Sequence, residues 1–220
     1  MKHFDTGKFN KLLNTSKFGR KFKYFDSIDS TNDHATDLVE KSQGVDLERL
    51  DGTLILAERQ TGGRGRFKHK WLSPQGGLWF SLITITDIRP EELPNLTLIA
   101  AFSVSETFMD IYNIDVDIKW PNDLYYGEYK FGGILSELKK DGKFQAIIIG
   151  IGINMNIDDK TLDGLDNTAT SIRKILGREA DRELILARIL EDFERSYDYF
   201  STTGDFKSLF SKWEKNIRYQ

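Results

Sequence analysis

The sequence predicts an α+β fold in which helices cover one face of a mixed, largely antiparallel sheet. Strand-like segments dominate the middle of the chain, helical segments dominate its last third, and a helix-start signal lies near its beginning. Runs of strands followed by runs of helices are typical of α+β proteins. The sequence contains no internal repeat, low-complexity linker or shift in composition, which favours a single domain over residues 1–220.

The first third of the chain is expected to alternate helices with short strands. Ser30, Thr31 and Asn32 form a helix-start signal, because short polar side chains can accept hydrogen bonds from the first turn of a helix. The aliphatic run at residues 53–57 is typical of a strand. The predicted elements here are helices at residues 9–18 and 30–41 and strands at residues 23–27 and 52–59.

The middle of the chain carries most of the predicted sheet and one long helix. Residues 78–86 are apolar on both faces, as is usual for a central strand. Residues 95–112 repeat apolar side chains at helical spacing, so they are expected to form a core helix. The remaining predicted elements are strands at residues 115–120, 132–139 and 144–153 and helices at residues 180–199 and 206–213.

The composition excludes several classes of protein. The 31 Lys and Arg residues and 34 Asp and Glu residues give a formal net charge of −3, whereas a nucleic-acid-binding surface needs clustered positive charge. No signal peptide is recognisable, and no stretch approaches the roughly 18 apolar residues of a membrane span. Cysteine is absent and the three histidines are far apart in sequence, which argues against thiol chemistry and a Cys- or His-ligated metal. We therefore expect a cytoplasmic protein that binds neither nucleic acid nor membrane.

A loop rich in glycine and arginine follows the second predicted strand, at residues 60–66. Its glycines let the backbone approach a ligand closely, and Arg64 and Arg66 carry forked cationic donors that match phosphate or carboxylate oxygens. Lys68 is not followed by Ser or Thr, which excludes a Walker A loop, and it stands where a dinucleotide fingerprint needs glycine. The residues alone leave a solvated surface loop as the alternative. Trp71 is either a wall for a flat ligand or an aromatic packed over a turn.

Further polar segments lie at predicted strand ends, where functional sites are commonly built. Residues 119–123 end one strand with the sequence Lys-Trp-Pro-Asn-Asp, and Lys130 stands beside Gly132 and Gly133 at the start of the next. Asn154 follows the last predicted strand. Turn formation is an equally good explanation for these Asn and Asp residues.

Taken together and in this order, these segments resemble the biotin protein ligase family. The Gly-Arg-Gly-Arg loop combined with Lys-Trp-Pro-Asn-Asp is specific to that family, and lipoate ligases and octanoyl transferases of the same fold normally lack the pair. The resemblance extends over residues 23–213. It implies a catalytic domain like that of class II synthetases, without an N-terminal helix-turn-helix domain and with the C-terminal SH3-like barrel absent or truncated.

The resemblance implies a two-step reaction. The biotin carboxylate attacks the α-phosphate of ATP to form biotinyl-5′-adenylate, and a lysine of a biotin carboxyl carrier protein domain then attacks this mixed anhydride. ATP and Mg²⁺ are the implied cofactors, biotin is the substrate, and a homodimer through a sheet edge is compatible with the family. Two alternatives stay open: a core that binds biotin or its adenylate with weak turnover, and a lipoate-type ligase of the same fold.

The resemblance also implies a role for each motif residue. Lys130 and Arg66 are expected to be catalytic, and Asp123 is expected near a Mg²⁺ site. The residues expected to bind biotin are Ser30, Thr31, Gln60, Gly63, Arg64, Lys130, Gly132, Gly133 and Trp79, with a place in the core as the alternative for Trp79. The residues expected to bind ATP or the adenylate are Asn32, Arg64, Arg66, Trp71, Lys119, Asn122, Asp123 and Asn154. In one departure from the family, Phe67, Lys68 and His69 replace a glycine- and arginine-rich continuation of the loop.

Overall fold

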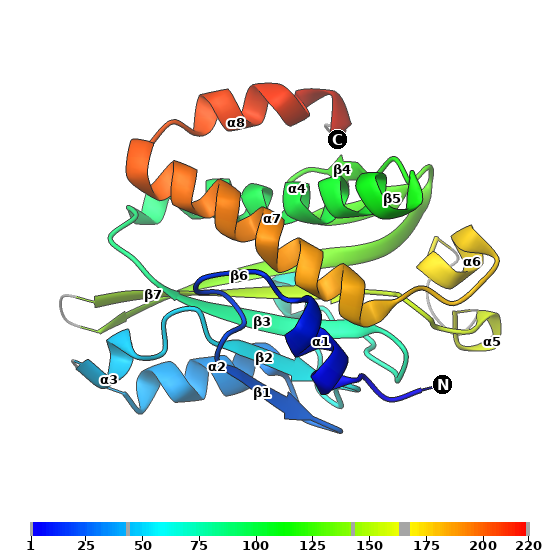
Figure 1. Ribbon diagram of the computed structural model, residues 1–220, viewed down its shortest axis with the longest axis horizontal. Coiled ribbons are helices and arrows are strands. Elements are labelled where there is room, and N and C mark those ends of the chain that lie inside the picture. Colours follow the sequence, from blue (N-terminus) through cyan, green and yellow to red (C-terminus); the bar gives the residue numbers. More distant parts are fainter. Residues whose placement is uncertain (1, 43–44, 142–143, 163–167, 219–220) are drawn as a thin grey trace.

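A computed structural model describes residues 2–42, 45–141, 144–162 and 168–218 (Figure 1). The strands are β1 Phe22–Phe25, β2 Leu54–Ala57, β3 Leu78–Ile85, β4 Asp117–Lys119, β5 Asp123–Tyr126, β6 Tyr129–Asp141, β7 Phe144–Ile153 and β8 Ile217–Arg218. The α-helices are α1 Thr6–Leu12, α2 Thr31–Glu40, α3 Val45–Glu48, α4 Leu93–Tyr112, α5 Asp159–Leu162, α6 Ile172–Leu176, α7 Arg182–Thr203 and α8 Phe206–Trp213. Short 3-10 helices lie at Arg66–Lys68, Pro90–Glu92 and Glu214–Asn216.

Within these ranges the eight strands form one mixed sheet, in the order β1-β2-β3-β7-β6-β5-β4-β8. The β1–β2 and β4–β8 pairs are parallel and the other neighbours are antiparallel. The predicted α+β class and largely antiparallel sheet are confirmed. In the part of the chain that the structure describes, no helix combines the length and apolarity needed to cross a bilayer.

Helices cover both faces of the sheet, so the expectation of one covered face is wrong. The larger core lies between the sheet and α1, α4, α7 and α8, whereas Ala35 and Val39 of α2 pack against Ile55 and Ile83 on the opposite face. Figure 1 shows α4, α7 and α8 on one side of the central strands and α2 on the other. The second layer was hard to predict because only two of the buried side chains of α2, Ala35 and Val39, are apolar.

The start of α2 matters most for the site. Ser30 caps this helix as predicted, since its hydroxyl accepts a hydrogen bond from the Asp33 N–H at 3.3 Å. The cap fixes where the first turn begins, and Thr31 and Asn32 therefore lie buried against the sheet.

Other elements differ from the prediction mainly at their ends. Strand β7 and helix α8 have the predicted bounds, whereas the short elements α3, α5, α6, β5 and β8 were not predicted. Strand β5 is short and half-buried, which leaves little apolar pattern to recognise. Helix α1 ends at Leu12, so the prediction of a helix over residues 9–18 is wrong for its second half.

A carboxylate explains the loop that replaces this second half. Glu194 of α7 accepts hydrogen bonds from the backbone N–H groups of Ser16, Lys17 and Phe18 and from the Ser16 hydroxyl. Burial alone would raise the pKa of Glu194, but these N–H donors stabilise the charged form more strongly and lower it. The loop is therefore tied to α7 by an ionised group.

Glu194 is expected to make the free energy of unfolding depend on pH in the acidic range. Its lowered pKa contributes stability that is present above the ordinary glutamate pKa of about 4.5 and is lost as the pH falls through the folded value. Urea unfolding should show Glu194→Gln less stable than the wild type at pH 7, with the gap narrowing below that pKa. Glu179→Gln, at an exposed position, is the control and should follow the wild type at every pH. A gap that stays constant with pH would contradict the assignment.

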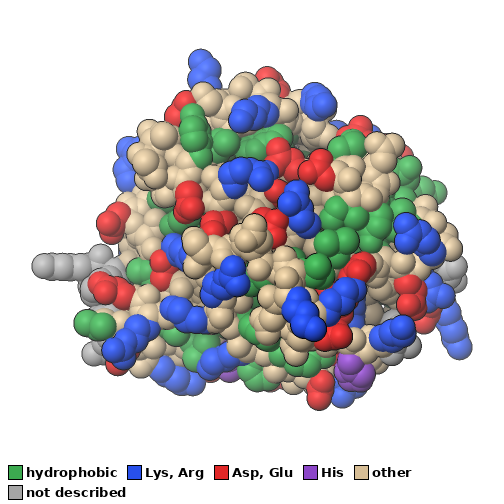
Figure 2. Space-filling model, viewed as in Figure 1, with side chains coloured by type: hydrophobic (Ala, Val, Ile, Leu, Met, Phe, Trp, Pro, Cys, Tyr) green, Lys and Arg blue, Asp and Glu red, His purple; other side chains and the backbone are tan. Residues whose placement is uncertain are grey.

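The surface has no broad field of one charge sign on the face drawn in Figure 2. There, Lys and Arg side chains alternate with Asp and Glu side chains. This arrangement agrees with the formal net charge of −3.

Candidate active site

A cavity of about 680 Å³ lies on the α2 side of the sheet. Its wall is built by the first turn of α2, the loop at residues 64–72 and the segment at residues 120–123. Residues from the ends of β6 and β7 complete it. A volume of this size is typical of small-molecule and cofactor sites.

Glycines form the floor of the cavity. Gly133 of β6 pairs with Gly152 of β7, and Gly150 lies two residues before Gly152 in β7. A Cβ atom on Gly152 would lie 2.7 Å from the Trp71 Nε1, and one on Gly150 would lie 2.1 Å from the Asn32 Oδ1. The bare backbone at these positions is therefore what lets side chains and ligands approach the sheet closely.

Three cationic side chains face this floor. The Lys130 Nζ lies 2.7 Å from the Asp123 Oδ2 and 5.3 Å from the centre of the Trp71 ring. The Arg66 guanidinium donates to the Asn122 Oδ1 at 3.2 Å. The third cation is Arg64, and side chains of this kind can donate hydrogen bonds to phosphate or carboxylate oxygens.

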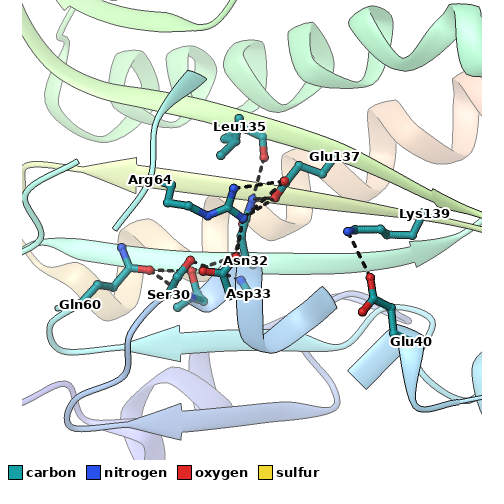
Figure 3. Close-up of polar contacts among 11 residues, drawn as sticks. Ser30, Asn32, Asp33, Glu40, Gln60, Arg64, Leu135, Glu137 and Lys139 are labelled. Atoms are coloured by element: carbon teal, nitrogen blue, oxygen red, sulfur yellow. Dashed lines mark hydrogen bonds and ion pairs between the residues drawn. The ribbon is translucent and has the colours of Figure 1, made fainter. Parts of the chain in front are cut away.

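Arg64 is held by two carboxylates. It pairs with Asp33 and with Glu137, whose Oε2 lies 3.1 Å from a guanidinium nitrogen (Figure 3). Burial opposes the charge of Arg64, but the hydrogen bond to Asp33 and the charges of both carboxylates outweigh it and raise the Arg64 pKa. The guanidinium Nε is buried without a hydrogen-bond partner in the described structure.

A chain of hydrogen bonds connects the loop to α2. The Gln60 side chain accepts from the Thr31 N–H at 2.8 Å and donates to the Ser73 hydroxyl at 2.8 Å. The Ser81 hydroxyl of β3 lies 2.8 Å from the Thr31 Oγ1 and 2.6 Å from the Asn32 Oδ1. These contacts fix the side chains around one end of the cavity.

Most of the residues predicted for the site meet in this cavity. Those that line it are Ser30, Thr31, Asn32, Gln60, Arg64, Arg66, Trp71, Asn122, Asp123, Lys130, Gly133 and Asn154. Asn32, however, donates both of its amide hydrogens to protein oxygens, the Leu135 carbonyl and the Glu137 carboxylate. Asn154 donates to the Thr170 carbonyl oxygen at 3.0 Å and so ties the cavity wall to the segment before α6.

Four predicted site residues lie outside the cavity lining. Trp79 is fully buried, packs against Ile157 and Leu162, and donates to the Pro74 carbonyl, so the alternative of a core position describes it. The Lys119 ammonium lies 5.6 Å from the Tyr125 ring centre.

The other two are glycines that pack behind the wall. A Cβ on Gly63 would lie 2.4 Å from the Trp71 carbonyl oxygen, and one on Gly132 would lie 2.9 Å from the Leu124 Cδ1. Both residues are therefore needed for close packing.

The sequence analysis missed Asp33, Ser73, Ser81 and Glu137. Ser81 left a signal, because it is a polar residue inside the apolar strand β3 and is fully buried. The other three are polar residues of a kind usually found at the surface, so the sequence gives no signal for them. Only the fold brings Asp33 and Glu137 to Arg64 and Ser73 to Gln60.

One carboxylate of the cavity wall could contribute to a cation site. Asp123 lines the cavity beside Lys130. Across the described ranges, no three His, Cys, Asp or Glu side chains gather as metal ligands. Mg²⁺ is commonly bound by one or two carboxylates together with substrate phosphates, so this donor set fits an ion that arrives with a nucleotide.

Comparisons with known proteins identify the family of this chain. The pattern of the biotin/lipoate A/B protein ligase family matches residues 24–154. The chain is 37% identical over 205 residues to the bifunctional ligase/repressor BirA of Bacillus subtilis, covering 92% of this chain and 61% of that protein. It is 32% identical over 190 residues to the BirA of Escherichia coli, covering 86% of this chain and 56% of that protein. The chain thus spans about three fifths of the length of these curated relatives.

A solved structure has the same fold. The biotin protein ligase from Aquifex aeolicus in complex with biotin and ATP superposes with a TM-score of 0.72 and 35% sequence identity. The match covers 90% of this chain and 78% of that one. The family pattern spans more than half of the residues and includes Ser30, the arginine loop and Lys130. The chain therefore belongs to the biotin/lipoate A/B protein ligase family.

Proposed function

We propose that this chain activates biotin with ATP as biotinyl-5′-adenylate and transfers the biotinyl group to a lysine of a biotin carboxyl carrier protein domain. One observation carries the proposal: Lys130, Arg64 and Arg66 surround a single cavity whose floor is bare glycine backbone. The names of the relatives and the biotin and ATP complex of the Aquifex aeolicus protein support the choice of substrates.

The first step brings two anions together. A carboxylate oxygen of biotin attacks the α-phosphorus of ATP, a P–O bond forms, and the bond to the departing pyrophosphate breaks. Lys130 and Arg66 would neutralise the approaching charges and the charge that develops on the α-phosphate. The glycine floor would let the acyl phosphate lie directly on the sheet beside Lys130.

The second step consumes the mixed anhydride. The neutral ε-amine of the acceptor lysine attacks the acyl carbon, an amide forms, and AMP leaves with the bonding electron pair. The proton that the nitrogen loses passes to the departing phosphate or to water. The intermediate hydrolyses readily in water, so the cavity would have to exclude water until the acceptor arrives. The Gly-Arg loop contributes Arg64, Gly65 and Arg66 to the cavity wall and would be the segment that does so.

The remaining roles are those that the family resemblance implies for residues in the cavity wall. Ser30, Thr31 and Gln60 form the end of the cavity that would hold the biotin ring system, and Arg64 would contact the biotin carboxylate. Trp71, Asn122 and Asp123 would form the nucleotide end, with Asn154 in support. Asp123 would hold a nucleotide-bound Mg²⁺, which supplies neutralisation of phosphate charge when present.

The direct test is biotin-dependent exchange of labelled pyrophosphate into ATP by the purified chain. Exchange with biotin supports the adenylation step, and transfer is then assayed with a carrier domain. Exchange with lipoate or octanoate in place of biotin would favour the lipoate-type ligase that the family name also includes. Calorimetric biotin binding without exchange would favour the binding core.

Location and assembly stay predictions. We propose a cytoplasmic protein whose partner is the carrier domain, and we propose that it can form a homodimer through a sheet edge. Cell fractionation tests the first statement, and sedimentation with and without biotin and ATP tests the second.

A further inference from the structure

Glu137 connects three parts of the active-site cavity without lining it. It lies on β6 opposite Ile148 of β7, on the α2 side of the sheet. Its Oε2 accepts from the Asn32 Nδ2 at 2.9 Å and lies 3.1 Å from the Arg64 guanidinium (Figure 3). One carboxylate therefore joins the sheet, the start of α2 and the Gly-Arg loop.

The first group that Glu137 holds is the Asn32 amide. The second amide hydrogen goes to the Leu135 carbonyl oxygen at 3.2 Å, and the Oδ1 lies 2.6 Å from the Ser81 hydroxyl. Because an amide has two N–H hydrogens, none is left to donate to a ligand. Asn32 therefore has a structural role, in which its side chain connects α2 to the sheet. Gly150 provides the space that the Asn32 Oδ1 occupies.

The second group is Arg64. A long guanidinium side chain facing a cavity has many rotamers, and ordering it on binding costs conformational entropy. Glu137 and Asp33 order Arg64 before any ligand arrives. A carboxylate beside Arg64 could also do the opposite and compete with an anionic substrate for the same guanidinium.

We propose that Glu137 is a positioning residue that holds Arg64 and Asn32 in the geometry that receives the anionic substrate, a role that rests on the proposed function. Glu137 itself contacts neither substrate. Its influence reaches the reaction through Arg64, whose place in the cavity wall is set by the pair.

The direction in which Glu137→Ala changes the KM for biotin distinguishes a positioning role from competition for Arg64. If Glu137 positions Arg64, Glu137→Ala raises the KM for biotin in pyrophosphate exchange and lowers kcat/KM by about 10- to 100-fold, as misplacement of a binding group does. If Glu137 competes for Arg64, the same change lowers the KM. An unchanged or lowered KM overturns the proposal. Glu137→Gln, which keeps the volume and removes the charge, replaces the alanine variant if that one fails to fold.

The chain offers a matched control. Glu40 of α2 pairs with Lys139 of β6 at 3.3 Å, so it also connects α2 to β6, but outside the cavity (Figure 3). Glu40→Gln should leave the KM for biotin unchanged. In an Arg64→Lys background, Glu137→Ala should add little further loss, because its effect runs through Arg64. Full additivity of the two losses, or an equal effect of Glu40→Gln, overturns the proposal.

A readout without substrate keeps this test separate from that of the proposed function. In the ligand-free protein, NMR of the Asn32 side-chain amide and of the Arg64 Nη–H groups, which contact Glu137, should show signals protected from exchange, with protection lost in Glu137→Ala and kept in Glu40→Gln. If the wild type lacks biotin-dependent exchange, the proposed function fails and these signals alone decide on positioning. Signals that are unchanged in Glu137→Ala overturn it.

Discussion

Lys130→Ala is expected to lower biotin-dependent pyrophosphate exchange by at least about a hundredfold, the effect of removing one preorganised group that stabilises transition-state charge. The Lys130 ammonium lies at the glycine floor between Asp123 and the Trp71 ring, where the two anions of the first step would meet. The half-buried Asp123 loses its partner in this variant, but water still reaches it, so the melting temperature should fall by only a few degrees.

Two variants separate charge from position at this site. Lys130→Arg keeps the charge but replaces a compact ammonium by a planar fork, so exchange should stay low. Lys139→Ala removes a lysine from the same strand outside the cavity, and it should exchange at the wild-type rate. Wild-type exchange by Lys130→Ala would contradict the assigned role.

Arg182→Met is expected to destabilise the fold by about 3–5 kcal/mol, the usual cost of leaving one partner of a buried ion pair uncompensated. Arg182 of α7 is 6% exposed and makes two parallel hydrogen bonds to Glu58, at 3.0 and 3.1 Å. Burial raises the pKa of Glu58, but Arg182 and the Phe4 N–H outweigh it and keep the pKa low. At about 2–4 °C per kcal/mol, calorimetry should show a melting temperature lower by roughly 10 °C.

Matched variants identify the cause of that loss. Arg49→Met removes one partner of the exposed Arg49–Asp46 pair and should change stability by less than about 0.5 kcal/mol. Adding Glu58→Gln to Arg182→Met should restore part of the stability, because no buried charge then remains. A melting temperature within 2 °C of the wild type, a threshold of roughly 1 kcal/mol, would contradict this account.

The buried Arg182–Glu58 pair is also expected to affect the active-site cavity. Glu58 directly follows β2 and lies two residues before Gln60, from which the Gly-Arg loop begins. A loosened pair should therefore misplace Gln60, and the KM for biotin should rise along with the loss of stability.

Much of the fold could be predicted from local patterns in the sequence. The cap at Ser30, the apolar strand β7 and the amphipathic helix α8 each have a pattern that needs no knowledge of the rest of the chain. The site motifs were also local, since glycines, arginines and strand-end polar residues stand in short segments. That these motifs meet in one site was predicted only from the resemblance of the ordered segments to a known family. The spacing of each motif alone left a structural explanation open.

Long-range pairings could not be predicted. The register that sets Gly133 opposite Gly152 decides that Gly133 faces the cavity and Gly132 faces the core, and no periodicity distinguishes two adjacent glycines. Glu137 meets Arg64 only because β6 passes beneath α2. Trp79 lies on the strand next to the floor but is covered by Ile157 and Leu162, which are distant in sequence.

The pairing of β4 with β8 at one edge of the sheet affects the order in which parts of the site form during refolding. Strands β6 and β7 are neighbours in sequence and in space, so this hairpin, with its glycine floor, closes a short loop of chain. Strand β4 pairs with β8, where Ile118 meets Ile217, and the Trp120 N–H donates to the Arg218 carbonyl oxygen at 3.1 Å. Because distant contacts form more slowly than local ones, the floor is expected to become protected early in refolding. Asp123 pairs locally with Gly133 of β6 and should gain protection with the floor, whereas Trp120 of the cavity wall, which contacts the distant Arg218, should gain it later.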